Sequence, residues 1–185
     1  MGHIIFAMNV SLDGFITDSA GEIAFPAPGP DLFAHFTDFM RDTALALCGR
    51  RLYEAMSYWD SPDDVIGPDP AGLEFARLWR ETPKVVFSTT LKEVGPNARL
   101  VEGDAPAIVR PIKDQTEGTI FVEGPNLAGQ LAKAGLIDEF RLYFHPVVLG
   151  GGKPFFSERS PLDLRFLGKE ILPQDVVMLR YGPAV

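Results

Sequence analysis

Short apolar runs alternate with amphipathic stretches along most of the chain. The apolar runs have the length of buried strands and cover residues 3–8, 44–48, 84–87 and 119–122. Between the first two runs, apolar residues recur at spacings of three and four over 31–42, which predicts a helix. Because strands and helices take turns along the sequence, the pattern predicts an α/β domain with a mostly parallel sheet.

Turn and capping residues mark further elements in the middle of the chain. A helix is expected to begin near Arg50, directly after Gly49. Another is expected at Asp69-Pro70, because an aspartate followed by proline is typical of a helix start. The pattern then predicts a short strand at 99–101 and helices at 106–113 and 125–134.

The C-terminal part of the chain is expected to contain only strands. Aromatic and aliphatic residues alternate with other residues over 140–144, and Pro173 separates two further strands at 164–172 and 175–181. These two strands suit an antiparallel hairpin at the edge of a sheet. We therefore expect one domain over residues 1–185, with three layers, a mostly parallel central sheet, an antiparallel C-terminal edge and helices on both faces.

Composition and charge narrow the function classes. The chain has 185 residues, of which 46% are hydrophobic, as expected for a globular domain. Its net charge of −8 argues against non-specific binding to nucleic acid or to an anionic membrane. Cys48 is the only cysteine, so no internal disulfide can form. With no membrane-spanning run and no basic, signal-like start, the sequence predicts a cytoplasmic protein.

The first candidate site is the strand-to-helix junction at Cys48-Gly49-Arg50-Arg51. Two arginines in the first turn of a helix oppose the helix dipole. A bound phosphate would reverse this effect, since it meets both the helix N–H groups and the guanidinium groups. The alternative is one surface arginine and one arginine paired with an acid in the sheet.

Two other strand ends carry possible ligand-binding residues. Gly124 in Glu123-Gly124-Pro125-Asn126 would let the backbone approach a ligand, although an ordinary turn needs the same residues. The hydroxyl groups of Ser88-Thr89-Thr90 could bind a phosphate or cap the next turn.

Several common sites are not supported by the sequence. The run Gly150-Gly151-Gly152-Lys153 is not a P-loop, because Val147 and Pro154 stand where that motif needs a glycine and a hydroxyl residue. Neither Gly-x-Gly-x-x-Gly nor Gly-x-Ser-x-Gly occurs. The dispersed histidines and the single cysteine have no metal-ligand spacing, so no metal is expected. His145 is expected to be packed or hydrogen-bonded, and Cys48 to be a buried thiol.

The order of motifs resembles the dihydrofolate-reductase-like superfamily. The similarity is greatest to the reductase domain of bacterial riboflavin biosynthesis enzymes and its stand-alone relatives. The elements that carry it run in the family's order from residue 4 to about 156: Ser11-Leu12-Asp13-Gly14-Phe15-Ile16, Gly49-Arg50-Arg51-Leu52-Tyr53-Glu54, Ser88-Thr89-Thr90-Leu91, Val122-Glu123-Gly124 with Gly135-Leu136-Ile137-Asp138-Glu139, and Pro146-Val147-Val148-Leu149-Gly150 with Pro154-Phe155-Phe156.

The resemblance implies an NADPH-dependent reductase that acts on a small molecule, and a homodimer. It implies that Ala7 and the Asp13-Gly14 loop line the nicotinamide and substrate end, and that Gly49, Arg50 and Arg51 hold the cofactor phosphates. By the same resemblance, Ser88 and Thr89 lie near the adenosine 2′-phosphate, which favours NADPH over NADH. Glu123, Gly124, Asn126 and Leu127 would pass beneath the pyrophosphate or the nicotinamide.

The chain also departs from the family pattern. The paired glycines after the glutamate are reduced to Gly124 followed by Pro125, and Leu52 replaces a threonine that would add a hydroxyl group to the phosphate site. Phe15 replaces a lysine, which favours a flat, less charged substrate over a phosphorylated pyrimidine. Folate reductases carry an acidic residue on the first long helix, and Asp31 and Asp38 are both candidates for it.

The leading hypothesis is hydride transfer from NADPH to a C=N or C=O bond of a small heterocyclic, pterin- or pyrimidine-like compound. Asp13 would orient the substrate or relay a proton, or it would only close the turn from Ser11 to Gly14. Glu123 would hydrogen-bond the substrate or the cofactor, or form a structural salt bridge. Two other hypotheses are a nucleotide-binding module without turnover, motivated by the missing glycine, and a structural dimerisation domain.

Overall fold

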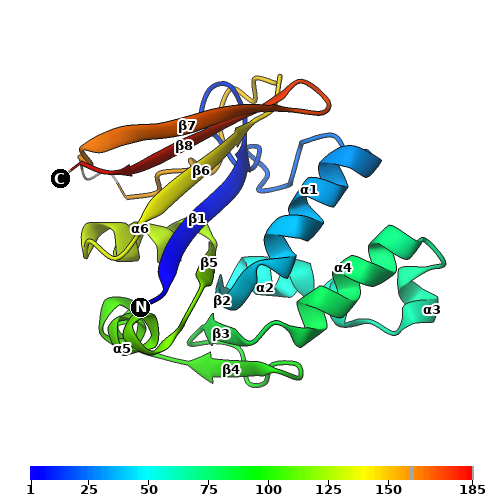
Figure 1. The fold of residues 1–185 in the computed structure, drawn as a ribbon, viewed down its shortest axis with the longest axis horizontal. Coiled ribbons are helices and arrows are strands. Elements are labelled where there is room, and N and C mark those ends of the chain that lie inside the picture. The colour runs from blue at the N-terminus through cyan, green and yellow to red at the C-terminus, as the bar shows by residue number, and fades with distance from the viewer. Residues whose placement is uncertain (159–160, 185) are drawn as a thin grey trace.

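An eight-stranded sheet forms the centre of the computed structural model, which describes residues 1–158 and 161–184 (Figure 1). Its strand order is β4-β3-β2-β5-β1-β6-β8-β7. The strands are β1 (His3–Val10), β2 (Thr43–Gly49), β3 (Lys84–Phe87), β4 (Ala98–Val101), β5 (Thr119–Glu123), β6 (Glu139–Phe144), β7 (Leu164–Leu172) and β8 (Val176–Pro183). The first six strands pair in parallel, and β8 runs antiparallel to both β6 and β7. The predicted parallel sheet with an antiparallel C-terminal edge is confirmed.

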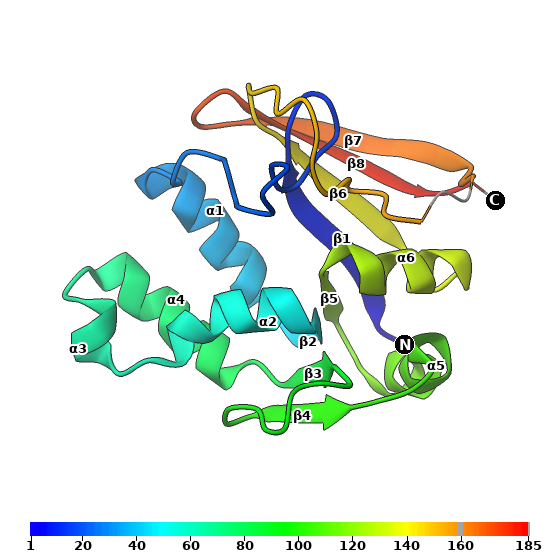
Figure 2. The same cartoon turned by 180° about the vertical axis from the view of Figure 1, so that it is seen from behind.

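Helices cover both faces of the sheet, so the predicted three-layer arrangement is also confirmed (Figure 2). The helices are α1 (Pro30–Arg41), α2 (Arg50–Met56), the 3-10 turn η1 (Ser57–Asp60), α3 (Asp63–Ile66), α4 (Pro70–Glu81), α5 (Ala105–Gln115) and α6 (Pro125–Lys133). Helices α1 to α4 lie on one side of the sheet and α5 and α6 on the other (Figures 1 and 2).

Capping side chains mark the start of α4 and of α5. The Asp69 carboxylate accepts a hydrogen bond from the Gly72 N–H at 3.1 Å, so this residue caps α4 as predicted. Asp104 caps α5 in the same way, through the Ala107 N–H. The short helices η1 and α3 were not predicted, because the sequence over 57–66 has no apolar period.

The sheet separates two sets of apolar contacts. Under α5 and α6 lies a core that includes Phe6, Val122 and Leu131. Under α1 and α4 lies a second cluster, which includes Cys48 and Trp79. Both β1 and β5 are buried on two faces, which explains why their sequences are continuous apolar runs rather than alternating ones.

The carboxyl ends of the six parallel strands lie at the same edge of the sheet, because parallel strands point in the same direction. The long connections over 11–29 and 145–158 leave β1 and β6 at this edge. Within the two described ranges, no helix is both long enough and apolar enough to cross a membrane.

Candidate functional site

The strand ends bring most of the predicted site residues to one edge. Asp13 and Gly14 follow β1, Arg50 and Arg51 follow Gly49 at the end of β2, and Ser88 and Thr89 follow β3. Gly124, Asn126 and Leu127 follow β5, which lies between β1 and β2. Residues that are far apart in the sequence therefore gather around β5, where α2 and α6 both begin.

Gly49 and Gly124 allow two turns of backbone to approach closely. A Cβ atom on Gly49 would lie 3.4 Å from the carbonyl oxygen of Glu123, and one on Gly124 would lie 3.7 Å from Cα of Gly49. Gly124 has a φ angle of 110°, which other residues rarely adopt. Side chains are thus kept away from the point where the two helices begin.

The first turn of α6 is free of competing anionic groups. Its N-cap, Gly124, offers no side chain to accept a hydrogen bond, and the first turn contains no acidic residue. The same is true of α2, whose N-cap is Gly49. Backbone N–H groups in such positions suit an anion, although Pro125 removes one of them from α6.

Arg50 and Arg51 both lie near the surface at the start of α2. Arg50 donates two hydrogen bonds to the carboxylate of Glu54, at 2.9 and 3.1 Å, and is still 39% exposed. Arg51 is exposed, and no carboxylate lies within salt-bridge distance of it in the described parts of the chain. The alternative of an arginine paired with an acid in the sheet is wrong, because the partner of Arg50 lies one turn along its own helix.

Asp13 is held by several hydrogen bonds within the protein. Its carboxylate accepts from the Ser11 hydroxyl at 2.6 Å and from the N–H groups of Leu149 and Gly150 at 3.1 and 2.7 Å. The Ser11 hydrogen bond is the main cause of a lowered pKa of Asp13. The turn-closing role is confirmed, and the same carboxylate ties this loop to the loop after β6.

Lys153 also lies at this edge, although the sequence analysis considered it only in excluding a P-loop. Its Nζ donates a hydrogen bond of 2.5 Å to the side-chain oxygen of Asn126 in the first turn of α6. Gly152 fits so tightly here that a Cβ atom would lie 1.9 Å from the carbonyl oxygen of Thr17. The glycine run of 150–152 thus allows the loop after β6 to pack closely against the loop after β1. This packing places the Lys153 cation beside α6. The contact joins residues 27 positions apart, so no local motif indicated it.

Glu123 lies beneath this edge with its carboxyl group buried. The residue is 1% exposed, the Cys48 thiol donates to Oε2 at 3.6 Å, and Oε1 has no hydrogen-bond partner among the described residues. Burial raises the pKa of Glu123 to about 7. The structural salt bridge that the sequence left open is not formed within residues 1–158 and 161–184.

Ser88 and Thr89 differ in their surroundings. The Ser88 hydroxyl oxygen accepts from the N–H groups of Thr90 and Leu91 at 3.1 and 3.0 Å, so the capping role is confirmed for this residue. Thr89 is exposed at the same turn.

Ala7 and Leu127 are both buried, but in different places. Ala7 is 4% exposed and lies beside Glu123, since Phe6 pairs with Val122 one position earlier. Leu127 is also 4% exposed and packs in the core under α6. Its side chain is therefore part of the packing, and only its backbone remains available to a ligand.

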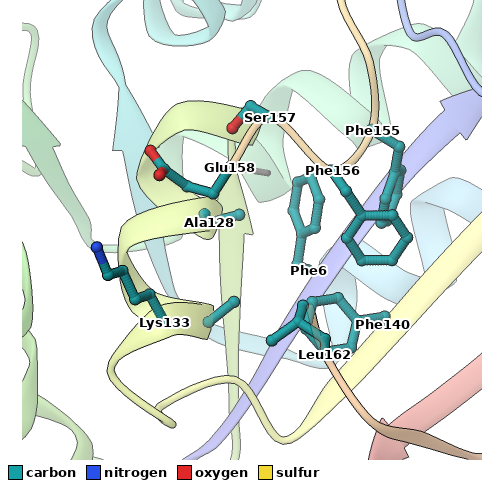
Figure 3. A pocket seen from close by; sticks show the side chains of 11 residues that line it. Phe6, Ala128, Lys133, Phe140, Phe155, Phe156, Ser157, Glu158 and Leu162 are labelled. Atoms are coloured by element: carbon teal, nitrogen blue, oxygen red, sulfur yellow. The ribbon is translucent and has the colours of Figure 1, made fainter. Parts of the chain in front are cut away.

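An apolar pocket lies elsewhere, on the α6 side of the sheet (Figure 3). Phe6, Phe140, Phe155 and Phe156 line it, and the ring centroids of Phe6 and Phe155 are 4.4 Å apart. Figure 3 shows Lys133 and Glu158 farther from these rings. The rings pack on one another here, and this pocket is separate from the strand-end residues listed above.

The metal-binding residue types do not gather at this edge. Among the described residues, no group of three His, Cys, Asp or Glu side chains is arranged to hold a metal ion. His145 is buried and its Nε2 lies 3.0 Å from the side-chain oxygen of Asn9, which confirms the hydrogen-bonded role expected for it.

The sheet order and the helices on both faces correspond to a dihydrofolate-reductase-like α/β fold. The fold of the chain is similar to that of dihydrofolate reductase from Enterococcus faecalis, solved in complex with NADP(H) and RAB-propyl. The match covers 100% of this chain and 98% of the reductase, with a TM-score of 0.66 and 13% sequence identity. Residues 2–178 match the RibD C-terminal domain family, and the chain belongs to that family.

Two other relatives match over nearly their whole length. YyaP of Bacillus subtilis (strain 168), a protein described as uncharacterized, is 31% identical over 181 residues, 97% of this chain and 94% of YyaP. A protein from Shewanella sp. PV-4, provisionally assigned to riboflavin biosynthesis, is 24% identical with a TM-score of 0.75, and the match covers 100% of both chains. The predicted family resemblance is confirmed.

Proposed function

We propose that the protein is an NADPH-dependent reductase that transfers hydride to a C=N or C=O bond of a small heterocyclic, pterin- or pyrimidine-like compound. The observation that carries the proposal is the close approach of Gly49 and Gly124, with uncapped helix starts and two arginines beside it. Membership of the RibD C-terminal domain family supports a reductase of the riboflavin-pathway type.

The residues at the edge fit a dinucleotide cofactor, which supplies the hydride when bound. Gly49 and Gly124 would admit the pyrophosphate, and Arg50 and Arg51 would neutralise its charge. Ser88 and Thr89 would lie at the 2′-phosphate. Ala7, Gly14, Asn126 and Leu127 would contact the rest of the cofactor, Asn126 by its amide and Leu127 by its backbone.

Two carboxyl groups would serve the substrate end in different ways. Asp13 has a lowered pKa and accepts hydrogen bonds from the loop after β6, so it would hold the two loops together around the ligand. Glu123 has a raised pKa and an oxygen without a hydrogen-bond partner among the residues that the structure describes, so it would offer a proton or a hydrogen bond to the substrate.

Calorimetric titration with NADPH at low salt tests the cofactor part of the proposal. Arg50→Ala should weaken NADPH binding by roughly 1–3 kcal/mol, because a charge-assisted hydrogen bond is lost. Arg77→Ala is the matched control, since Arg77 is an exposed arginine on α4 that pairs with Glu74 and Glu81. NADH should bind more weakly than NADPH. An Arg50→Ala variant with unchanged affinity would remove the phosphate-site assignment.

A nucleotide-binding module without turnover remains the second candidate, because Pro125 takes away one N–H group of the α6 first turn. NADPH binding without NADPH oxidation across pterins, pyrimidinones and quinones would favour this module over the reductase. We also propose a homodimer, which the family resemblance supports together with the exposed apolar residues Phe166 and Ile171 on the edge strand β7.

A further inference from the structure

Two loops pair with each other beside the start of α6. Lys153 belongs to the loop after β6, and its carbonyl oxygen accepts a hydrogen bond from the Ile16 N–H at 2.7 Å. The N–H of Lys153 donates to the Thr17 hydroxyl at 3.3 Å, and the next residue, Pro154, forms a β-bridge with Phe15. The loop after β1 therefore holds the backbone of Lys153 through both its N–H and its C=O group.

The loop after β6 also packs on the first turns of α6. The Ser157 hydroxyl donates a hydrogen bond of 2.6 Å to the carbonyl oxygen of Pro125. Gly129, one turn further along the helix, leaves room for this loop, because a Cβ atom there would lie 2.6 Å from Cγ of Glu158 and 3.0 Å from Oγ of Ser157. The place of Lys153 beside α6 is thus set by two independent groups of contacts.

The ammonium group of Lys153 lies at the end of α6 where a cation is disfavoured. Its Nζ donates to the side-chain oxygen of Asn126, in the first turn of the helix, at 2.5 Å. Asn126 is exposed and Lys153 is partly exposed, so a ligand that contacts this turn also reaches the ammonium group. Within residues 1–158 and 161–184, no carboxylate lies within salt-bridge distance of Lys153. A cation beside a helix N-terminus opposes the helix dipole, and an anion bound between them would reverse this effect.

The strand order separates Lys153 from the two arginines of the candidate site. β5, which leads into α6, has β2 on one side and β1 on the other, and β6 follows β1. Arg50 and Arg51 come directly after β2, whereas Lys153 comes from the loop after β6. In the proposed function the 2′-phosphate would lie after β3 and the nicotinamide near β1, three strand spacings away, or roughly 14 Å at about 4.8 Å each. An extended dinucleotide can span this length, with its adenosine phosphates on the arginine side and its nicotinamide-side phosphate on the Lys153 side.

We propose that Lys153 is a third cation of the cofactor site and that its ammonium group binds the phosphate attached to the nicotinamide ribose. The inference rests on the proposed function and adds to it a residue to which the sequence analysis gave no ligand. A hydrogen bond between an ammonium group and a phosphate is stronger than one between neutral groups. The neutral oxygen of Asn126 keeps Lys153 beside α6 without cancelling its charge, which a carboxylate at position 126 would do.

Calorimetric titrations with NADPH and with 2′,5′-ADP, which lacks the nicotinamide-side phosphate, test this assignment. Lys153→Met should raise the Kd for NADPH by about 10-fold or more, because a charge-assisted hydrogen bond is lost, and should leave the Kd for 2′,5′-ADP unchanged. Lys153→Arg keeps the charge and should bind NADPH within about 3-fold of the wild type, since a guanidinium group also binds phosphate. In about 1 M NaCl the effect of Lys153→Met should shrink, because salt screens exposed charges.

Lys133→Met is the matched control, because Lys133 is an exposed lysine in the last turn of the same helix. It should leave both dissociation constants unchanged. If Lys153→Met binds NADPH as tightly as the wild type while Arg50→Ala binds it more weakly, the inference is overturned and the cofactor site stands. An equal loss of affinity for NADPH and 2′,5′-ADP, or a loss that salt does not reduce, would make Lys153 only a structural contact between the loop and α6 and would also overturn it. No binding of NADPH by the wild type would overturn the proposed function and this inference with it.

Discussion

Glu123 couples the stability of the protein to pH in an unusual direction. Burial raises its pKa to about 7 in the folded chain, above the ordinary value of a glutamate. The unfolded chain therefore gives up this proton at lower pH than the folded chain, so the free energy of unfolding falls as pH rises from about 4.5 to 7. Above pH 7, ionisation of Glu123 lowers the free energy of unfolding by on the order of 3 kcal/mol relative to pH values below 4.5.

Glu123→Gln should remove this loss, because a neutral amide does not ionise. Chemical denaturation at pH 5 and pH 8 should show a smaller decrease in unfolding free energy for Glu123→Gln than for the wild type. Cys48 and Lys84 lie near the same carboxyl group and remain in both proteins. The difference between the two proteins in the decrease of unfolding free energy is therefore due to Glu123. An equal decrease in both proteins would show that the Glu123 carboxyl is not responsible.

Glu139 illustrates the opposite case in the same sheet. Burial alone would raise its pKa, but hydrogen bonds from Arg180 and Arg141 outweigh burial and lower the pKa to about 2. Its contribution to stability is present above pH 4.5 and is lost as pH falls toward 2. Two buried glutamates of similar exposure, 1% and 3%, thus titrate on opposite sides of their ordinary value, because Glu139 forms ion pairs with arginines whereas Glu123 forms none among the described residues. Composition and periodicity cannot distinguish them.

Among the elements, α4 depends on a single capping side chain. Asp69→Ala should lower the free energy of unfolding by about 1 kcal/mol, because the Gly72 N–H loses its acceptor. Glu117→Ala is a suitable comparison, since Glu117 is exposed in a loop. Urea denaturation of the two variants beside the wild type measures the difference. Equal stability of Asp69→Ala and the wild type would show that water caps this helix equally well.

The elements that could be predicted from the sequence are those with local causes. The β1 and β5 runs, the Asp69 cap and the Gly49 and Gly124 turns each depend on a few neighbouring residues, and all of them lie where expected. Contacts between distant loops have no such local signal. Asp13 meets Leu149 and Gly150, more than 130 positions away, and Lys153 meets Asn126, so this part of the candidate site emerged only from the fold.

At the scale of the whole molecule, the edge hairpin presents an apolar surface that simple alternation would miss. Phe166 and Ile171 are five positions apart in β7, which by alternation places them on opposite faces. The pairing register shifts between Phe166 and Gly168, and the two residues lie opposite Tyr181 and Val177 of β8, which share one face. The irregularity therefore brings two exposed apolar side chains, 58% and 80% exposed, to the same side of the hairpin.

If a second copy of the chain covers this surface, charge introduced there should separate the copies. Light scattering after gel filtration should give twice the 20.3 kDa chain mass for the wild type and a single chain mass for Phe166→Lys combined with Ile171→Lys, because burying two unpaired cations outweighs the apolar contact. Ile23→Lys, at an exposed apolar residue of the loop before α1, should remain a dimer. Two results would show that this surface is not an interface: a wild type with the mass of a single chain, or a variant that stays dimeric with both lysines. In that case β7 would be an exposed edge strand, and only its irregularity would protect it from pairing with another strand.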